Sequence, residues 1–326
     1  QQFRSLIVGQ DAFATERIWD LMYREAVHGR KGAAMMAISA IDCALWDLKG
    51  RALGQPVHRL LGGPVRTSAP AYASMLGFSL EPDLARQHSH DHVAQGYRAL
   101  KWFPRWGPTD GDAGLRANLE LVEAIRDGAG PGIHIMIDAW LRWNRDYTLR
   151  FAREVERLGV HWIEEPVLPD KIALHAEIRR HSPVPIATGE HEYTRWGMKD
   201  LLDAGACDVL QADTFWAGGL SEMVKICHLA SLYDIPVIAH GHSVPANMAL
   251  TAAMPELLTP WVEYLVKWNE LLQFFWKVPV KPVAGIVTVP DRPGLGVDID
   301  ETRIEEEVEL SWQAMPNMAG SVQNRD

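Results

Sequence analysis

The chain has 326 residues, enough for one large domain or two of ordinary size. Hydrophobic residues make up 47% and charged residues 23%, which is the composition of a globular protein with ample material for a core. The formal net charge of −10 disfavours nucleic acid or an anionic membrane as the main partner, and no apolar run reaches the ~18 residues of a membrane span.

The first segment, residues 1–66, is expected to be mostly helical. Apolar residues recur at helical spacing between Gly32 and Gly50. We expect Gly50 and Gly54 to end this helix and Pro56 to begin a new turn.

From about residue 68, eight strand-like runs alternate with helix-length stretches. This alternation predicts βαβ units and a parallel sheet, and eight runs over about 200 residues fit an α/β fold with a (β/α)8-type barrel. A doubly wound open sheet is the alternative, but no Gly-x-Gly-x-x-Gly motif follows the first run. The runs are Ala69–Ser74, Arg98–Phe103, Ile133–Trp140, His161–Glu165, Val184–Glu190, Ala206–Asp213, Ile235–Gly241 and Val262–Leu265.

Three of these runs carry a carboxylate at or near their end. Asp138, Glu164 and Glu190 follow one another at intervals of 26 residues, which is about one strand–helix–strand repeat of a barrel. We therefore expect them on adjacent strands at the carboxyl-end face, where barrel active sites lie. Three gathered carboxylates repel one another unless a cation joins them, and oxygen ligands favour Mg²⁺, with Mn²⁺ as the second choice.

Two other interpretations of these acids remain open. Each carboxylate taken alone is more simply a helix cap or a loop charge. Glu164 and Glu190 could also form the carboxylate pair of a metal-independent barrel glycosidase, although Asp138 would then have no role.

The next two runs supply a candidate base and its partner. Asp213 and His240 are 27 residues apart, again one repeat, so we expect them to be neighbours. An aspartate bonded to an imidazole fixes its tautomer and raises its basicity. His242 competes with His240, which we favour because it directly ends the apolar run. Glu263, a further 23 residues along, could donate a hydrogen bond or a proton to an oxyanion if it is protonated.

A metal facing a base suits removal of a proton next to a carboxylate. Such a carbon acid is very weak, so a Lewis acid must stabilise the enediolate while the imidazole takes the proton.

Together these residues resemble the enolase superfamily, in its mandelate racemase-like group and the L-rhamnonate dehydratase subgroup. The resemblance covers nearly the whole chain and implies a modified TIM-like barrel over 67–279. It also implies an α+β capping domain over 1–66 that about 280–326 completes. The motifs that carry it are 40–50, 55–56 and 60–63, which resemble the capping helix and its exit, and 106–108, 110–114, 189–191 and 216–219, which resemble the subgroup.

The resemblance implies dehydration of an acid sugar to a 2-keto-3-deoxy acid, with the three acids as Mg²⁺ ligands. His240 then takes the C2 proton with the help of Asp213, and protonated His240 or another acid helps the 3-hydroxyl leave. Glu263 matches a residue that stabilises the transition state, and His191 is a candidate substrate contact. A homo-oligomer is also implied.

One departure from the group concerns its second barrel strand. Racemases and lactonising members carry a Lys-x-Lys pair there, but here the sequence reads Lys101-Trp102-Phe103. Residues i and i+2 share a strand face, so only Lys101 could ionise on that face. A catalytic role for Lys101 stays open, but we expect it to be structural or to contact a substrate carboxylate. A site with one base favours β-elimination over racemisation.

A second departure concerns the amino terminus. The group's cap begins with strands and a mobile loop, whereas here only Phe3–Val8 is a candidate strand, so we expect an amino-terminally incomplete view of the protein.

Other activities stay open at this point. They are another activity of the superfamily, such as an epimerase or a different sugar-acid dehydratase, and a decayed barrel that only binds a ligand or supports an oligomer. Three scattered cysteines without zinc-ligand spacing suit a reducing compartment such as the cytoplasm.

Overall fold

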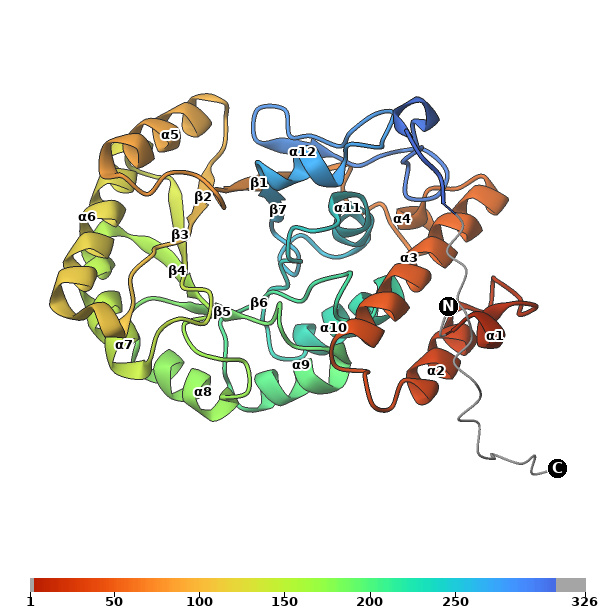
Figure 1. Cartoon of the computed structure of the whole chain (residues 1–326), viewed down its shortest axis with the longest axis horizontal. Coiled ribbons are helices and arrows are strands. Elements are labelled where there is room, and N and C mark those ends of the chain that lie inside the picture. The colour runs from red at the N-terminus through yellow and green to blue at the C-terminus, as the bar shows by residue number, and fades with distance from the viewer. Residues whose placement is uncertain (1–2, 309–326) are drawn as a thin grey trace.

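A computed structural model describes residues 3–308 of the chain. It shows a ring of strands with helices outside it, and the first helices pack against one side of the ring (Figure 1). The strands are β1 (Ser68–Ser74), β2 (Ala99–Trp102), β3 (His134–Asp138), β4 (Val160–Glu164), β5 (Ile186–Thr188), β6 (Val209–Leu210), β7 (Val262–Leu265) and β8 (Ile286–Thr288).

The strands of the ring are parallel, in the order β6-β5-β4-β3-β2-β1-β7, and β8 adds antiparallel to β1. Seven of the eight expected runs therefore form strands, and the predicted α/β barrel is confirmed. The run at 235–241 makes only a bridge from Val237 to Leu210. Its backbone still follows β6, because the His240 N–H donates to the Ala212 carbonyl at 3.1 Å.

Helices follow the strands as expected for βαβ units (Figure 1). Short 3₁₀ turns at Pro108–Asp110, Glu156–Leu158 and Glu301–Arg303 complete the described elements. The outer helices are α5 (Pro82–Ala94), α6 (Gly111–Ala129), α7 (Arg145–Val155), α8 (Ile172–His181), α9 (Thr194–Asp203), α10 (Leu220–Ser231), α11 (Val244–Ala253) and α12 (Trp268–Leu272).

The interior of the ring is built in two layers. Successive inward side chains on a strand are two residues apart, so a polar layer lies directly on an apolar one. The apolar layer is Tyr72, Ala99, Met136, Trp162, Ala187, Val209 and Ile238. Two residues further along the same segments, the buried polar layer includes Ser74, Lys101, Asp138, Glu164, Gln211 and His240.

The long helix of the first segment, α3, continues past Gly50, where it was expected to begin ending. α3 spans Ala33–Leu53 and runs through Gly50, and it ends at Gly54, whose φ of 64° is left-handed. Gly50 has a different role, because a Cβ there would lie 2.7 Å from Gly294 Cα and from the Gln55 carbonyl oxygen. Its missing side chain lets the C-terminal segment pack against the helix.

The other helices of the first segment are α1 (Arg4–Ile7), α2 (Thr15–Glu25) and α4 (Val57–Leu60). Pro56 precedes α4, as expected. The strand expected at Phe3–Val8 was wrong. Phe3, Leu6 and Ile7 have the i, i+3, i+4 spacing of one helix face, and they pack against the cluster around α2 and α3.

The C-terminal segment returns to the first one. Asp47 accepts a hydrogen bond from the Leu295 N–H at 2.7 Å. Arg51 forms an ion pair with Asp298 at 3.0 Å. The division into a barrel and a capping domain remains a prediction, and its part at 309–326 lies outside the described residues.

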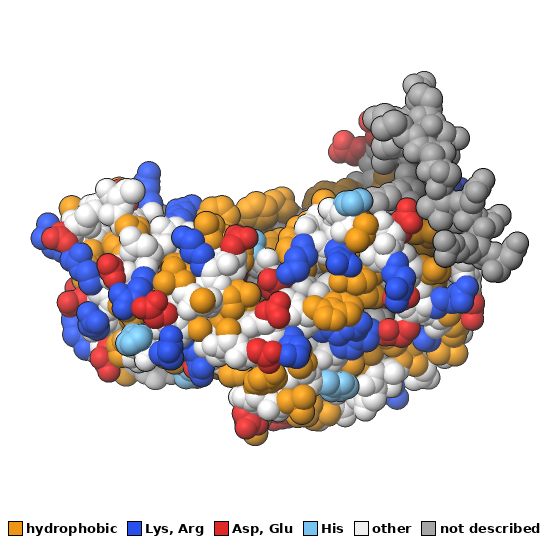
Figure 2. All heavy atoms as spheres, turned by 90° about the horizontal axis from the view of Figure 1, so that it is seen from below, with side chains coloured by type: hydrophobic (Ala, Val, Ile, Leu, Met, Phe, Trp, Pro, Cys, Tyr) orange, Lys and Arg blue, Asp and Glu red, His pale blue; other side chains and the backbone are white. Residues whose placement is uncertain are grey.

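The surface carries both signs of charge. On the side formed by α8 and α9, basic and acidic side chains are interspersed, so this face carries no single acidic patch (Figure 2). Within residues 3–308, none of the helices has the length and hydropathy needed to cross a bilayer.

Gly50→Ala tests whether the close approach outweighs helix propensity. Alanine in an open helix position should stabilise by about 1 kcal/mol. At Gly50 the clash of the new Cβ with Gly294 should outweigh this gain. We therefore expect the free energy of unfolding, measured in urea, to fall by about 1–3 kcal/mol. Ala52→Gly, at an exposed position of the same helix, should lose only the propensity of about 1 kcal/mol. A more stable Gly50→Ala variant would contradict the packing argument.

Candidate active site

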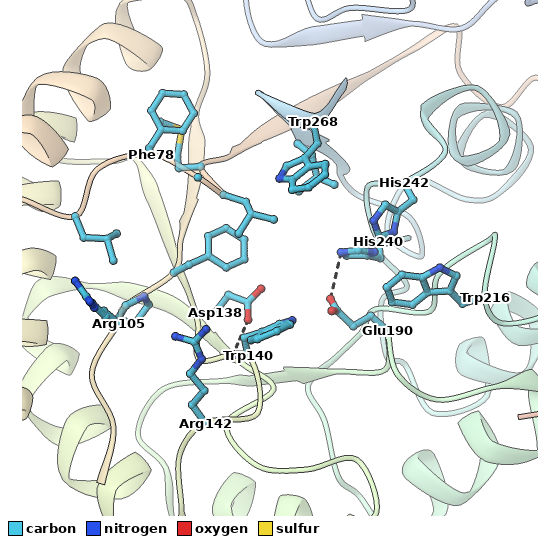
Figure 3. Close-up of a pocket in the computed structure, with 17 residues that line it drawn as sticks. Phe78, Arg105, Asp138, Trp140, Arg142, Glu190, Trp216, His240, His242 and Trp268 are labelled. Atoms are coloured by element: carbon cyan, nitrogen blue, oxygen red, sulfur yellow. Dashed lines mark hydrogen bonds and ion pairs between the residues drawn. The ribbon is translucent and has the colours of Figure 1, made fainter. Parts of the chain in front are cut away.

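A cavity of about 530 Å³ opens at the carboxyl ends of the strands. Figure 3 shows Asp138 and Glu190 pointing into it from one side and His240 facing Glu190. Its walls are mostly aromatic and aliphatic. The lining residues are Met75, Leu76, Gly77, Phe78, Leu80, Phe103, Pro104, Arg105, Asp138, Trp140, Arg142, Glu190, Trp216, His240, His242, Leu265 and Trp268.

Three buried carboxylates meet at the floor of this cavity. Asp138 ends β3, Glu164 ends β4, and Glu190 lies two residues beyond β5. One oxygen atom from each lies within 4.8 Å of the other two. The spacing of 26 residues therefore does bring these side chains together, as the sequence predicted.

The electrostatics of this group favour a bound cation. Burial raises the pKa of Asp138, and the neighbouring charge of Glu164 adds to that rise. Burial likewise raises the pKa of Glu190 to about 7. Within the described chain, Glu190 Oε2 accepts no well-aligned hydrogen bond, although His240 Nε2 lies 3.3 Å from it. An all-oxygen donor set with excess negative charge fits Mg²⁺.

Lys101 is the positive charge inside this group. Its side chain is 0% exposed, and its Nζ lies 2.5 Å from Glu164, 2.8 Å from Glu263 and 3.3 Å from Asp138. Burial alone would lower the pKa of Lys101, but the charges of Glu164 and Glu263 raise it. Phe103 lies on the same side, with its ring 5.4 Å from Nζ. The expected shared face is present, but Lys101 contacts carboxylates and is not part of the cavity wall.

Two further side chains hold Glu164 in place. Its Oε2 accepts hydrogen bonds from Gln211 Nε2 at 2.9 Å and Trp162 Nε1 at 3.1 Å. Gln211 was not among the predicted site residues, although its position two residues before Asp213 puts both on the same face of an extended segment.

Glu165, which directly follows Glu164 in the sequence, has a supporting position. Glu165 accepts hydrogen bonds from His191 Nδ1 at 2.6 Å and the Thr188 hydroxyl at 3.2 Å. Burial alone would raise the pKa of Glu165, and the bond from His191 outweighs it, so the pKa is lowered. His191 thus orients Glu165 beside Glu190, and its expected contact with substrate stays a prediction.

The predicted base and its partner are also adjacent. His240 Nδ1 lies 2.7 Å from Asp213 Oδ2, and His240 Nε2 lies 3.3 Å from Glu190 Oε2. Burial alone would lower the pKa of His240, but the charges of Glu190 and Glu263 raise it to about 10. His242 Nδ1 lies 2.9 Å from the same Asp213 oxygen, so the aspartate contacts both histidines.

The surroundings of Glu263 disfavour the protonated form that a proton donor would need, and its expected role in the transition state stays a prediction. Burial alone would raise its pKa, but Lys101 and His240 lower it to about 2. It is therefore a carboxylate, which accepts hydrogen bonds and cannot donate them. Its Oε2 accepts from the Gly241 N–H at 3.0 Å. In this position it supports the turn that carries His240.

Basic and aromatic residues on the cavity wall were missed or given little weight. The Arg142 guanidinium lies over the Trp140 ring, 5.1 Å from its centroid, and Arg105 faces the same side of the cavity (Figure 3). Trp140 and Leu141 have left-handed φ values of 44° and 66°, which are costly for such residues. This strained turn follows Asp138 directly and presents the indole to the cavity.

Side chains from the first segment hold the loop after β6. Gly218 donates its N–H to Ser39 Oγ at 2.9 Å, and its carbonyl accepts from Trp19 Nε1 at 2.8 Å. Asp42 accepts the Ser221 N–H at 2.9 Å, at the start of α10. The loop carries Trp216, which lines the cavity.

Comparison with protein families agrees with this geometry. Residues 83–303 match the enolase C-terminal domain-like family, and residues 1–62 match the N-terminal domain of the mandelate racemase / muconate lactonizing enzyme family. The chain belongs to the enolase superfamily, in its mandelate racemase-like group. The predicted resemblance is confirmed, and the protein is an enzyme of this superfamily.

Three similar proteins illustrate the relationship. L-rhamnonate dehydratase of Saccharopolyspora erythraea is 35% identical over 315 residues, covering 93% of this chain and 75% of the relative. D-galactarolactone cycloisomerase of Agrobacterium fabrum is 34% identical over 324 residues, covering 94% and 83%. The crystal structure of rhamnonate dehydratase from Gibberella zeae complexed with Mg has a TM-score of 0.83 and 32% identity, covering 93% and 73%.

Asp138→Asn should have opposite effects on the metal-free and metal-loaded protein. Because the pKa of Asp138 is raised on folding, its ionisation at neutral pH destabilises the folded state. The uncharged amide should stabilise the metal-free protein by about 1–2 kcal/mol. It should also abolish the rise in Tm that Mg²⁺ gives the wild type. The exposed Asp127→Asn should leave both measurements unchanged. A wild-type Tm that does not respond to Mg²⁺ would contradict the site.

Proposed function

We propose that this enzyme is a hydro-lyase that uses Mg²⁺ to dehydrate an acid sugar, an aldonate like L-rhamnonate, to a 2-keto-3-deoxy acid. The observation that carries the proposal is the meeting of two groups in one cavity. The carboxylate triad (Asp138, Glu164 and Glu190) lies on one side and the Asp213–His240 pair on the other, with His240 Nε2 3.3 Å from Glu190. Relatives named as dehydratases support the reaction class.

The residues of the chain divide the chemistry between them. Mg²⁺, when bound by the carboxylate triad, supplies Lewis-acid stabilisation of the charge that develops on the substrate carboxylate and lowers the pKa of the nearby imidazole. His240 takes the C2 proton at Nε2, since Nδ1 is held by Asp213. The pair fixes the tautomer, so the basic nitrogen faces the cavity.

Other residues select elimination and shape the site. Phe103 occupies the position of the second lysine of a Lys-x-Lys pair and has no proton to exchange. Returning a proton to the opposite face of C2 therefore lacks a donor on this strand, which favours β-elimination. Arg105 and Arg142 place guanidinium groups on the cavity wall, where they can bind the hydroxyls or the carboxylate of a sugar acid.

The glycosidase alternative fits the geometry poorly. A glycosidase needs two carboxyl groups open to the sugar on either side of the scissile bond. Glu164 is fully buried, and both its oxygens are engaged, by Lys101 and by Trp162 and Gln211. The Glu164 carboxylate is therefore not open to the cavity and cannot flank the scissile bond of a sugar.

A second activity within the superfamily is also supported by a comparison. The cycloisomerase relative is almost as similar as the dehydratase, with 34% identity against 35%. Both activities would use the same metal and base, so only the product distinguishes them.

A metal-dependence assay tests the proposed function. The protein should convert at least one acid sugar, from a panel that includes L-rhamnonate and arabinonate, to a product that reacts in a 2-keto acid assay. Chelation with EDTA should abolish turnover, because the charge on the substrate carboxylate is no longer stabilised, and added Mg²⁺ should restore it. Activity that persists in EDTA would favour a metal-independent enzyme. No turnover of any acid by the metal-loaded protein would favour a decayed barrel.

His240→Asn tests the assignment of the base. Asparagine can keep a hydrogen bond to Asp213 but cannot accept the C2 proton, so turnover should fall about 10²–10⁴-fold or become undetectable. Mg²⁺ affinity measured by calorimetry should change little, since none of the carboxylate triad is altered. Turnover at the wild-type rate would remove His240 from the mechanism.

A further inference from the structure

Two imidazoles share one aspartate beside the cavity. Asp213 Oδ2 lies 2.7 Å from His240 Nδ1 and 2.9 Å from His242 Nδ1. Burial alone would raise the pKa of Asp213, and the hydrogen bonds from both histidines outweigh it, so the carboxyl is ionised. A carboxylate only accepts hydrogen bonds, so both Nδ1 atoms carry hydrogen. Asp213 thus holds each ring at Nδ1, and the Nε2 atom of each ring is the one that can exchange a proton with a substrate.

Of these two rings, only His240 has a role in the proton abstraction proposed for this site. His240 Nε2 faces Glu190 at 3.3 Å. His242 Nε2 has no hydrogen-bond partner within residues 3–308, although the ring lines the cavity and 29% of the side chain is exposed. Trp216 packs against both rings, with centroids 5.4 Å from His240 and 4.7 Å from His242, so both are held firmly (Figure 3).

The spacing of the two rings suits two reacting atoms on neighbouring carbons. Their centroids are 4.5 Å apart, and both contribute to the same wall of the cavity. In a β-elimination, one group removes the hydrogen of C2 and another must supply a proton to the oxygen on C3, because hydroxide is a poor leaving group. The free atom of His242 lies beside the base and is not in contact with the carboxylate triad.

We propose that His242 is the general acid that protonates the departing 3-hydroxyl while His240 acts as the base; this inference rests on the proposed function. The C2–H bond breaks and its proton goes to His240 Nε2. The electron pair released at C2 forms the C2–C3 double bond as the C3–O bond breaks. For this step His242 starts with hydrogen on both nitrogens, as an imidazolium whose Nδ1–H stays on Asp213. The oxygen takes the proton from His242 Nε2 and leaves as water, so His242 becomes neutral as His240 becomes the imidazolium. The enol product then tautomerises to the 2-keto-3-deoxy acid, so atoms and charge balance.

His242→Asn in D₂O separates the two proton transfers. With an acid sugar that the wild type dehydrates, 2-keto acid formation should fall about 10²–10⁴-fold. Exchange of the C2 hydrogen with solvent, followed by proton NMR on the remaining substrate, should persist near the wild-type rate because His240 is intact. His240→Asn should lose both, and His90→Asn, an exposed histidine on α5, should lose neither.

A substrate with a better leaving group provides the second measurement. Fluoride departs without protonation, so the 3-deoxy-3-fluoro acid should restore elimination by His242→Asn to within about tenfold of the wild type. Dehydration by His242→Asn at the wild-type rate would overturn the proposal and make His240 both base and acid. Equal loss of exchange and elimination, without rescue by fluoride, would also overturn it and make His242 structural. Failure of the proposed function itself would appear in the wild type, which would eliminate from no acid sugar, and would remove this role as well.

Discussion

The repulsion among buried carboxylates is the constraint on which this site depends. Asp138, Glu164, Glu190 and Glu263 end up within reach of one another, away from water, with the ammonium of Lys101 in their midst. One lysine cannot neutralise four acids, and the raised pKa values of Asp138 and Glu190 register the excess charge. A barrel that needed only stability would hold apolar residues at these positions. The arrangement is favourable when a divalent cation completes it.

Strand periodicity turns that constraint into a geometry. Each strand places an apolar residue in the lower layer and a polar residue two positions later, so the acids rise from a rigid apolar floor. The chain then turns sharply away. Trp140, Leu141 and Glu165 all have left-handed φ values, from 40° to 66°, immediately beyond the metal-ligand candidates of β3 and β4. Strained backbone of this kind survives where the surroundings over-determine it, as at a functional site.

The same periodicity explains what could be read from the sequence. One barrel repeat of 26 or 27 residues was enough to place Asp138, Glu164 and Glu190 together and His240 beside Asp213, because each repeat returns the chain to the same height. Sequence spacing says nothing about which side-chain atoms meet. That is why neither the hydrogen bond from His191 to Glu165 nor the ion pair between Lys101 and Glu263 was predicted.

Elements with few residues were also hard to predict. The run at 235–241 looks like a strand, yet β6 is only two residues long, and the next segment follows it by isolated hydrogen bonds. Phe3–Val8 contains enough apolar residues for a strand, but packing on α2 and α3 selects a helical turn. In both places tertiary contacts outweigh local preference.

The barrel does not position its own base without help from the first segment. The loop after β6 carries Trp216, which packs on both His240 and His242. Ser39 and Trp19 hold that loop by hydrogen bonds to Gly218. At the start of α10, the Asp42 carboxylate accepts the Ser221 N–H, one of the backbone donors that the first turn of a helix leaves unpaired. A Cβ at Gly219 would lie 2.5 Å from Asp42 Oδ2, so the backbone of the loop and the side chain of α3 pack in direct contact here. The orientation of the His240 and His242 imidazoles is therefore a joint property of the ring of strands and of the helices packed against it.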